Sequence, residues 1–346
     1  MEKIKKMLSR GQAGWNLLLI VLIVLEFAVF GGTNAKFLRP QLLLTSISDN
    51  LAVFMLALFV TLVMCTGGMD IQVASLVGLT SIIIGVSWQD FGLPIWGAVA
   101  LAVVVVCLCG ALSGFLIGYC GVQAMVITLG GSFLYSGLAL LVSTLSNTAS
   151  YESIGGFPEE FRFIGTYSVG GVVPFQILVY LAMLIVAFIL LHKTKYGRKI
   201  ILTGVNPSAA EYSGINTRRV IMSTYVLSAL AAAIAGTVLT AYLGTAKSDL
   251  GGDITMDIIT AVVLGGTLST GGKGSIIGTA LASVAIALLR FGLPLCFKIG
   301  TQYLDIPVGI LLVAVIVGRS AATNTGIVPW IRSRFARKGS SEVSAQ

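Results

Sequence analysis

Long apolar runs, separated by short polar or glycine-rich stretches, fill the chain from residue 14 to residue 318. A membrane-spanning helix needs about 20 mostly apolar residues, within a usual range of about 17 to 25. By this measure the pattern predicts spans near residues 14–31, 47–66, 70–87, 94–118, 122–145, 171–191, 218–243, 254–267, 273–292 and 304–318. Several of these runs are short or interrupted by glycine pairs. We therefore predict an all-α polytopic membrane protein of about ten transmembrane helices, with eight to ten as the range.

Composition agrees with this prediction. Of the 346 residues, 56% are hydrophobic and 10% are charged, whereas a soluble domain carries about 25% charged residues. The net charge of +8 would suggest nucleic-acid binding in a soluble protein. Here the basic residues cluster between apolar runs, which is typical of cytoplasmic loops of membrane proteins. We expect a lipid bilayer and no nucleic acid as partner.

Charge also predicts the orientation. Lysine and arginine are concentrated in an N-terminal tail (1–13), a central loop (192–217) and a C-terminal tail (319–346), which should all be cytoplasmic. The loop 146–170 carries Glu152, Glu159 and Glu160 against Arg162 and should lie outside. The first apolar run follows a basic segment without a convincing cleavage site, so we interpret it as a signal anchor. Residues 14–318 then form one transmembrane domain with both termini in the cytoplasm.

The sequence carries no recognisable catalytic or metal site. The stretch "GGTLSTGGKGS" lacks the first glycine of a phosphate-binding P-loop at Thr267, and Gly274 stands where serine or threonine is required. The single histidine, His192, excludes a multi-histidine centre. The five cysteines fit no metal spacing and are interpreted as small buried hydrophobic residues. We expect no enzyme activity, no metal and no cofactor bound by this chain.

Two doubled glycines interrupt apolar runs far apart in the chain, in "TGGMD" (66–70) and "TGGKG" (270–274). Such interruptions in two parts of a chain point to a transport pathway, although both could be simple turns between spans. At the first, Gly67 and Gly68 would reverse the chain at the cytoplasmic end of a span, and Asp70 would cap the next helix. The residues that we consider as pathway candidates are Asn50, Gln72, Ser75, Tyr135, Gly271 and Gly272.

Four carboxylates fall within the expected spans, at Glu26, Asp49, Asp70 and Asp257. An intramembrane carboxylate is by default a functional candidate, but Glu26 and Asp49 lie near expected span ends, where interfacial water is reachable. No intramembrane basic partner is evident for any of them. We therefore expect no proton relay.

A short helix is predicted within the central cytoplasmic loop. Asn206 is a good N-cap, Pro207 suits the first helical position, and Gly214 is a typical helix end. The helix is either a docking element with a small-residue face or an ordinary connector. The candidate coupling residues are Gly204, Asn206, Pro207, Ala209, Ala210, Glu211 and Gly214.

Three stretches together resemble the permease subunits of bacterial sugar importers of the ATP-binding-cassette (ABC) class, the ribose, arabinose and galactose type. They are "TGGMDIQVASLVGL", "GRKIILTGVNPSAAEYSGINTRR" and "AVVLGGTLSTGGKGSIIGTALASV". The resemblance spans residues 45 to 318. It departs from the family pattern at Gln72 and Ala74, where serine and glycine are usual, and at Ser208, where glutamate is usual.

The resemblance implies a pore of two permease subunits in the inner membrane, formed with a related permease or with a second copy of this chain. A separate ATPase subunit would bind ATP and Mg²⁺ on the cytoplasmic face and receive the helix near 206–214, while a soluble binding protein would deliver the solute outside. Within the family, "YESIGGFPEEF", "LHKTKYGR", "YLGTAKSDLG" and "VIVGRS" most resemble the branch that imports autoinducer-2. The alternatives are a ribose or rhamnose importer and, from another class, an ion-coupled secondary transporter.

Overall fold

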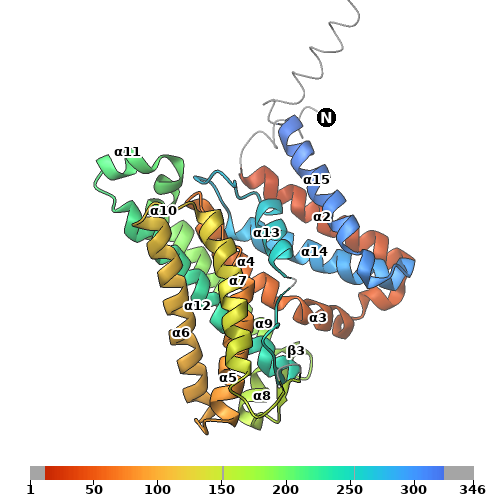
Figure 1. Ribbon diagram of the computed structural model, residues 1–346. Helices are drawn as coiled ribbons and strands as arrows, with labels where there is room; N and C mark the ends of the chain where they lie inside the picture. Colours follow the sequence, from red (N-terminus) through yellow and green to blue (C-terminus); the bar gives the residue numbers. More distant parts are fainter. Residues whose placement is uncertain (1–11, 150–151, 253, 323–346) are drawn as a thin grey trace, which may run out of the picture.

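The computed structural model describes residues 12–149, 152–252 and 254–322 of the chain. The expected N-terminal tail lies almost entirely outside these residues, as does the C-terminal tail beyond residue 322. The described chain is predominantly helical (Figure 1). Its α-helices are α2 (Gln12–Thr33), α3 (Pro40–Asp49), α4 (Leu51–Cys65), α5 (Val73–Gln89), α6 (Ile95–Gly118), α7 (Ala124–Ser143), α8 (Glu159–Thr166), α9 (Phe175–Phe188), α10 (Lys195–Val205), α11 (Pro207–Tyr212), α12 (Thr217–Leu243), α13 (Thr255–Leu264), α14 (Ile276–Phe297) and α15 (Asp305–Ala322).

Every expected span coincides with a helix or a pair of helices. Six helical stretches of the described chain are long and apolar enough to cross a membrane: Gly14–Thr33, Ile95–Gly118, Ala124–Ser143, Phe175–Lys193, Thr217–Leu243 and Ile276–Phe297. The pair α3 and α4, bent by 54° at Asn50, makes a seventh if it counts as one span. The shorter helices α5 and α13 and the apolar part of α15 fall below that length. An all-α polytopic membrane protein is confirmed, while the count of ten spans stays a prediction.

Helix α4 is the centre of the core. All of its residues are buried, because it is apolar on every side and therefore has no face to expose to water. Helices α9, α12, α13 and α14 pack around it. By contrast, α6 and α7 bury one stripe each and expose large apolar side chains such as Val104, Leu108 and Phe133. Exposed apolar faces of this kind suit contact with lipid.

Glycines bring α6 close to α12. A Cβ atom added at Gly110, Gly114 or Gly118 would lie 2.4 to 2.8 Å from atoms of Ala229, Met222 or Arg218 respectively. These glycines recur every fourth residue and so share one face of α6. Small residues let membrane helices approach closely enough for backbone contact.

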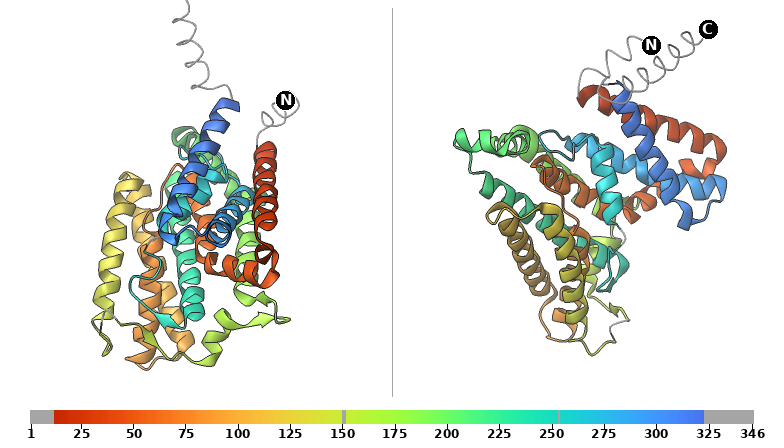
Figure 2. Two further views of the ribbon diagram at one scale, coloured as in Figure 1. Left: turned by 90° about the vertical axis from the view of Figure 1, so that its right-hand side faces the viewer. Right: turned by 45° about the horizontal axis from the view of Figure 1, so that its top comes forward.

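The two ends of the helical bundle differ in structure. Helices α10 and α11 lie at one end, and α8 lies at the other (Figure 1). At the α8 end, strand β1 (Ile154–Gly155) pairs antiparallel with β4 (Thr245–Ala246), and β2 (Ser168–Val169) pairs with β3 (Val173–Pro174). The loop expected to lie outside therefore sits opposite the loop expected to face the cytoplasm. Figure 2 shows α2, α14 and α15 grouped on one side, away from α6 and α7.

The close contact of α6 with α12 makes a stability prediction. Gly114→Leu should cost about 1 to 3 kcal/mol, because the new side chain overlaps the α12 backbone. The matched control is Gly130→Leu in α7, where no atom lies within 4 Å of an added Cβ. Thermal unfolding of the purified protein in detergent would measure both. An equal loss of melting temperature in the two variants would contradict the proposed packing.

Candidate functional site

The two doubled glycines meet in space. The amide of Gly272 donates a 2.9 Å hydrogen bond to the carbonyl of Cys65, the last residue of α4. Gly67, Gly271 and Gly272 have φ between +77° and +84°, a region that glycine adopts without steric cost. A Cβ on Gly271 would lie 2.6 Å from the Gly67 amide. Both motifs are therefore turns that pack on each other at the end of the core helix.

Helix α10 contributes a third partner to this contact. A Cβ on Gly204 would lie 1.9 Å from the Cys65 carbonyl oxygen and 2.5 Å from the Gly272 amide. We call Gly67, Gly204, Gly271 and Gly272, with the Cys65 carbonyl, the glycine junction. Gly271 and Gly272 are buried within it and line neither of the pockets described below. Their position gives no support to the predicted pathway role.

Asp70 lies two residues before the N-cap of α5 and is fully buried. The Ser228 hydroxyl of α12 donates a 2.6 Å hydrogen bond to Asp70 Oδ2. The backbone amides of Gln72 and Val73 approach the carboxylate, although Oδ1 receives no hydrogen bond of good geometry. The position fits the predicted cap of α5. The bond to α12 was not foreseen, and it makes Asp70 a tertiary link as well.

Gln72 and Tyr135 belong to one buried polar network. Ser113 of α6 donates a 2.8 Å hydrogen bond to Gln72 Oε1 and lies 3.1 Å from the Tyr135 hydroxyl. That hydroxyl donates to the Cys109 carbonyl at 3.0 Å. The pathway candidates Gln72 and Tyr135 thus join α5, α6 and α7. Ser113 was missed because a lone serine in an apolar run carries no signal of its own.

Ser75 lies one turn along α5 from this network and is half-buried. Its Oγ is 3.0 Å from Ser132 Oγ and accepts a 3.0 Å hydrogen bond from Ser136. Both partners belong to α7. The structure brings Gln72, Ser75 and Tyr135 together and leaves Asn50 elsewhere.

Asn50 lines an open pocket between α3 and α14 with a volume of about 630 Å³. Its lining residues, which define what we call the α3–α14 pocket, are Leu42, Thr45, Ser46, Asp49, Asn50, Arg290, Phe291, Pro294, Leu295 and Leu304. A second open pocket of about 480 Å³ is lined by residues of the segment 243–254.

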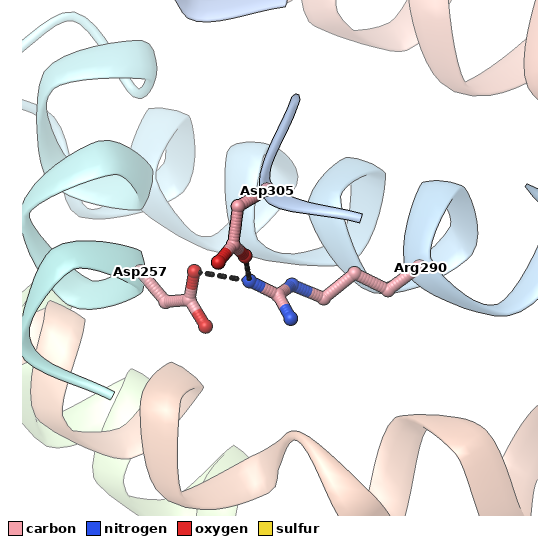
Figure 3. Close-up of polar contacts among 3 residues, drawn as sticks. All are labelled: Asp257, Arg290 and Asp305. Atoms are coloured by element: carbon pink, nitrogen blue, oxygen red, sulfur yellow. Dashed lines mark hydrogen bonds and ion pairs between the residues drawn. The ribbon is translucent and has the colours of Figure 1, made fainter. Parts of the chain in front are cut away.

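Arg290 joins two carboxylates from neighbouring helices. Its Nη2 lies 2.7 Å from Asp257 Oδ1 of α13 and 2.8 Å from Asp305 Oδ1 of α15 (Figure 3). The expectation that Asp257 has no intramembrane basic partner is therefore wrong. The signal was present in the sequence, since Arg290 interrupts the apolar stretch "AIALLRFGLPL" near the end of an expected span.

The other two intramembrane carboxylates differ from each other. Asp49 is exposed and accepts a 2.6 Å hydrogen bond from the Tyr242 hydroxyl, in keeping with a position near a span end. Glu26 lies well inside α2, is only 4% exposed, and neither of its oxygens has a hydrogen-bond partner among the described residues. The expectation that interfacial water reaches Glu26 is wrong. No group of three or more His, Cys, Asp or Glu side chains in the described chain could hold a metal ion.

The predicted helix after Asn206 is present as α11. Asn206 Oδ1 accepts a 3.1 Å hydrogen bond from the Ala209 amide, Pro207 occupies the first turn, and Gly214 has φ +80°. The predicted start and end of this helix are therefore confirmed. Ala209 is exposed and Tyr212 is 95% exposed.

The inner side of α11 is attached to the bundle. Ala210 is buried, and Glu211 accepts a hydrogen bond from the Thr217 hydroxyl at the start of α12. In the preceding α10, burial raises the pKa of the Tyr196 hydroxyl, which shares a 2.6 Å hydrogen bond with Ser223 of α12. These contacts make α10 and α11 one unit packed on α12.

Comparison with known proteins gives matches over most of the chain. Residues 42–327 match the family described as "Branched-chain amino acid transport system / permease component". The chain is 39% identical over 323 residues to the "Autoinducer 2 import system permease protein LsrD" of Enterobacter sp. (strain 638), covering 93% of this chain and 97% of that protein. It is 40% identical over 330 residues to the protein of the same name from Yersinia pseudotuberculosis serotype O:3 (strain YPIII), covering 94% and 98%. No solved structure gives a significant match.

Two substitutions of Asp70 distinguish its role as a hydrogen-bond acceptor from a requirement for its negative charge. Asp70→Asn should fold and keep much of its activity, because an amide oxygen still accepts hydrogen bonds from Ser228 and from the start of α5. Asp70→Leu should lose assembly, since it leaves the buried Ser228 hydroxyl without its acceptor, at a cost of about 1 to 3 kcal/mol. Size-exclusion chromatography of the purified protein measures assembly. A well-assembled Asp70→Asn protein without activity would show that the charge itself is required.

Proposed function

Because the chain belongs to the ABC-importer permease family that these matches identify, we propose that it carries autoinducer-2 across the inner membrane. It is a membrane-spanning permease and not an enzyme, since ATP hydrolysis in this family resides in a separate subunit. The observation that carries the proposal is the similarity to autoinducer-2 permeases over 97% to 98% of their length. The family description alone names a different solute class, branched-chain amino acids.

The proposed topology has ten spans within residues 14–318 and both termini in the cytoplasm. The outer loop 146–170 and the coupling loop 192–217 lie at opposite ends of the bundle, which supports this arrangement. The basic tails 1–13 and 319–346 join the coupling loop on the cytoplasmic side.

In this proposal α11 docks into a cleft of the ATPase subunit, which holds ATP and Mg²⁺. The exposed Ala209 and Tyr212 form the docking face, while the buried Ala210 holds the helix on the bundle. Displacement of α11 passes through α10 to Gly204, whose backbone touches the end of α4. Rigid elements in direct contact are what alternating access requires to turn ATPase closure into movement of the spans.

The remaining partners follow from the family. A soluble binding protein delivers the solute outside, and a second permease subunit completes the pore. We propose an LsrC-like permease as that subunit, with a second copy of this chain as the alternative. We propose that this chain itself binds no cofactor.

Two alternatives remain to be tested against autoinducer-2 import. A ribose or rhamnose importer would share the fold and the coupling helix. An ion-coupled transporter was first disfavoured because paired intramembrane charges were not expected, and the contact of Arg290 with Asp257 removes that reason. Family membership now carries the argument against it.

Substrate and energy source can be tested together. We expect the partner binding protein to bind autoinducer-2 more tightly than ribose or rhamnose in parallel titrations by calorimetry. We also expect the complete transporter in proteoliposomes to take up that solute only with ATP inside. Tighter binding of ribose or rhamnose would redirect the substrate assignment, and uptake without ATP would contradict an ABC importer.

The docking role of α11 can be tested at Ala209. Ala209→Arg should abolish copurification with the ATPase and ATP-driven uptake, because a long charged side chain then occupies the exposed docking face. Gln123→Arg, exposed at the same end but outside α11, is the matched control. Ala210→Arg is less informative because Ala210 is buried and the change would disturb folding. Normal ATPase binding by Ala209→Arg would contradict the docking role.

A further inference from the structure

The α3–α14 pocket has the dimensions and position of a solute site. Its volume of about 630 Å³ falls within the range of about 300 to 1,000 Å³ found for small-molecule sites. It opens where the span is broken between α3 and α4, and Pro294, inside the continuous helix α14, lines its other wall. Broken helices of this kind recur at solute sites of membrane transporters.

The face around this pocket is not suited to lipid. The side chain of Asp305 is 84% exposed, Asp49 is exposed, and Arg290 and Asp257 retain 23% and 18% exposure. Charged groups inside a bilayer face the protein interior or a water-filled cavity, because contact with hydrocarbon is costly. This side of α3, α14 and α15 therefore meets water or a partner subunit.

Hydrogen-bonding capacity remains within the pocket. Thr45 and Asn50 donate to carbonyls of their own helix, at 2.9 Å each, so the threonine hydroxyl oxygen and the asparagine amide oxygen can still accept. Among the described residues, Asp49 uses only Oδ1, toward Tyr242. Both ion pairs of Arg290 use Nη2, and Figure 3 shows the other terminal nitrogen pointing away from both carboxylates.

The charges that line the pocket balance. Asp49 and Arg290 are the charged residues of its lining, and they contribute one charge of each sign. A lining without net charge does not favour an ion over a neutral molecule, and its free acceptor atoms suit the hydroxyl groups of a neutral solute.

We propose that the α3–α14 pocket is the permease's own binding site for a neutral, hydroxyl-rich solute. This inference rests on the proposed function and adds to it the residues that meet the solute. Asn50 and Asp49 orient hydroxyl groups, Thr45 and Ser46 line the wall, and Arg290 with its two carboxylates closes the pocket on the α14 side.

The first test compares uptake by two variants with the same change in chemistry. Asn50→Leu should lower ATP-driven uptake by at least about tenfold in proteoliposomes that contain the complete transporter, while ATPase activity and assembly are kept. Gln41→Leu, which lies on the same helix α3 outside the pocket, should leave uptake unchanged. Thr45→Val is the milder second variant and should lower uptake by at least about threefold.

Equal uptake by Asn50→Leu, Thr45→Val and Gln41→Leu would overturn the pocket while leaving the importer function intact. Failure of the unaltered transporter to take up any of the tested solutes would instead count against the proposed function. If Asn50→Leu does not assemble, Thr45→Val and the labelling test below decide whether the pocket binds the solute.

The second test measures occupancy of the pocket directly. Ser46→Cys and Gln41→Cys in the complete transporter would each be labelled with 2-aminoethyl methanethiosulfonate, using the unaltered protein as blank. Autoinducer-2 should slow labelling of Ser46→Cys by at least about threefold and leave Gln41→Cys unchanged, because Ser46 lines the pocket and Gln41 does not. Equal labelling of Ser46→Cys with and without autoinducer-2 would overturn the site.

Discussion

The contact between the Cys65 carbonyl and the Gly272 amide is the constraint on which the arrangement of the bundle depends. The carbonyls in the last turn of a helix have no partner within that helix, and a buried one must find a partner elsewhere. Here an amide 207 positions further along the chain supplies it. That backbone approach is sterically possible because positions 204, 271 and 272 are glycine, and the turn before it needs the positive φ of Gly67.

The same contact lies at the end of the buried helix α4. With its end held between the two glycine turns, α4 is surrounded by α9, α12, α13 and α14, and none of its side chains reaches the surface. Helices such as α6 and α7 instead form the apolar outer surface, because each buries only one stripe of its side chains. Because α10 reaches the same point through Gly204, the helix that precedes α11 also touches the end of the buried helix α4.

Polar groups inside the apolar bundle fall into two classes with different surroundings. Asp70, Gln72 and Tyr135 are fully or almost fully buried. Their hydrogen bonds join the start of α5 to α6 and α12, and α7 to α6. Burying such groups is costly unless they are hydrogen-bonded, so their first contribution is to hold specific helices together. Asp49, Arg290 and Asp305 instead keep exposed atoms beside a pocket. Accessibility, more than residue type, separates structural polar groups from those that can meet a solute.

The sequence by itself determined the all-α membrane class, the positions of the helices and the capped helix after Asn206, because apolar run length, charge distribution and capping chemistry are local properties. The family could also be recognised from the sequence, since each of its motifs is a continuous stretch of residues. Only the tertiary structure decided that the two glycine pairs touch, that Asp70 bonds Ser228 and that Arg290 pairs with Asp257 and Asp305. Each of these contacts joins segments whose separation along the chain says nothing about their distance in space. Helix packing sets that distance, and it depends on which small residues let two backbones approach.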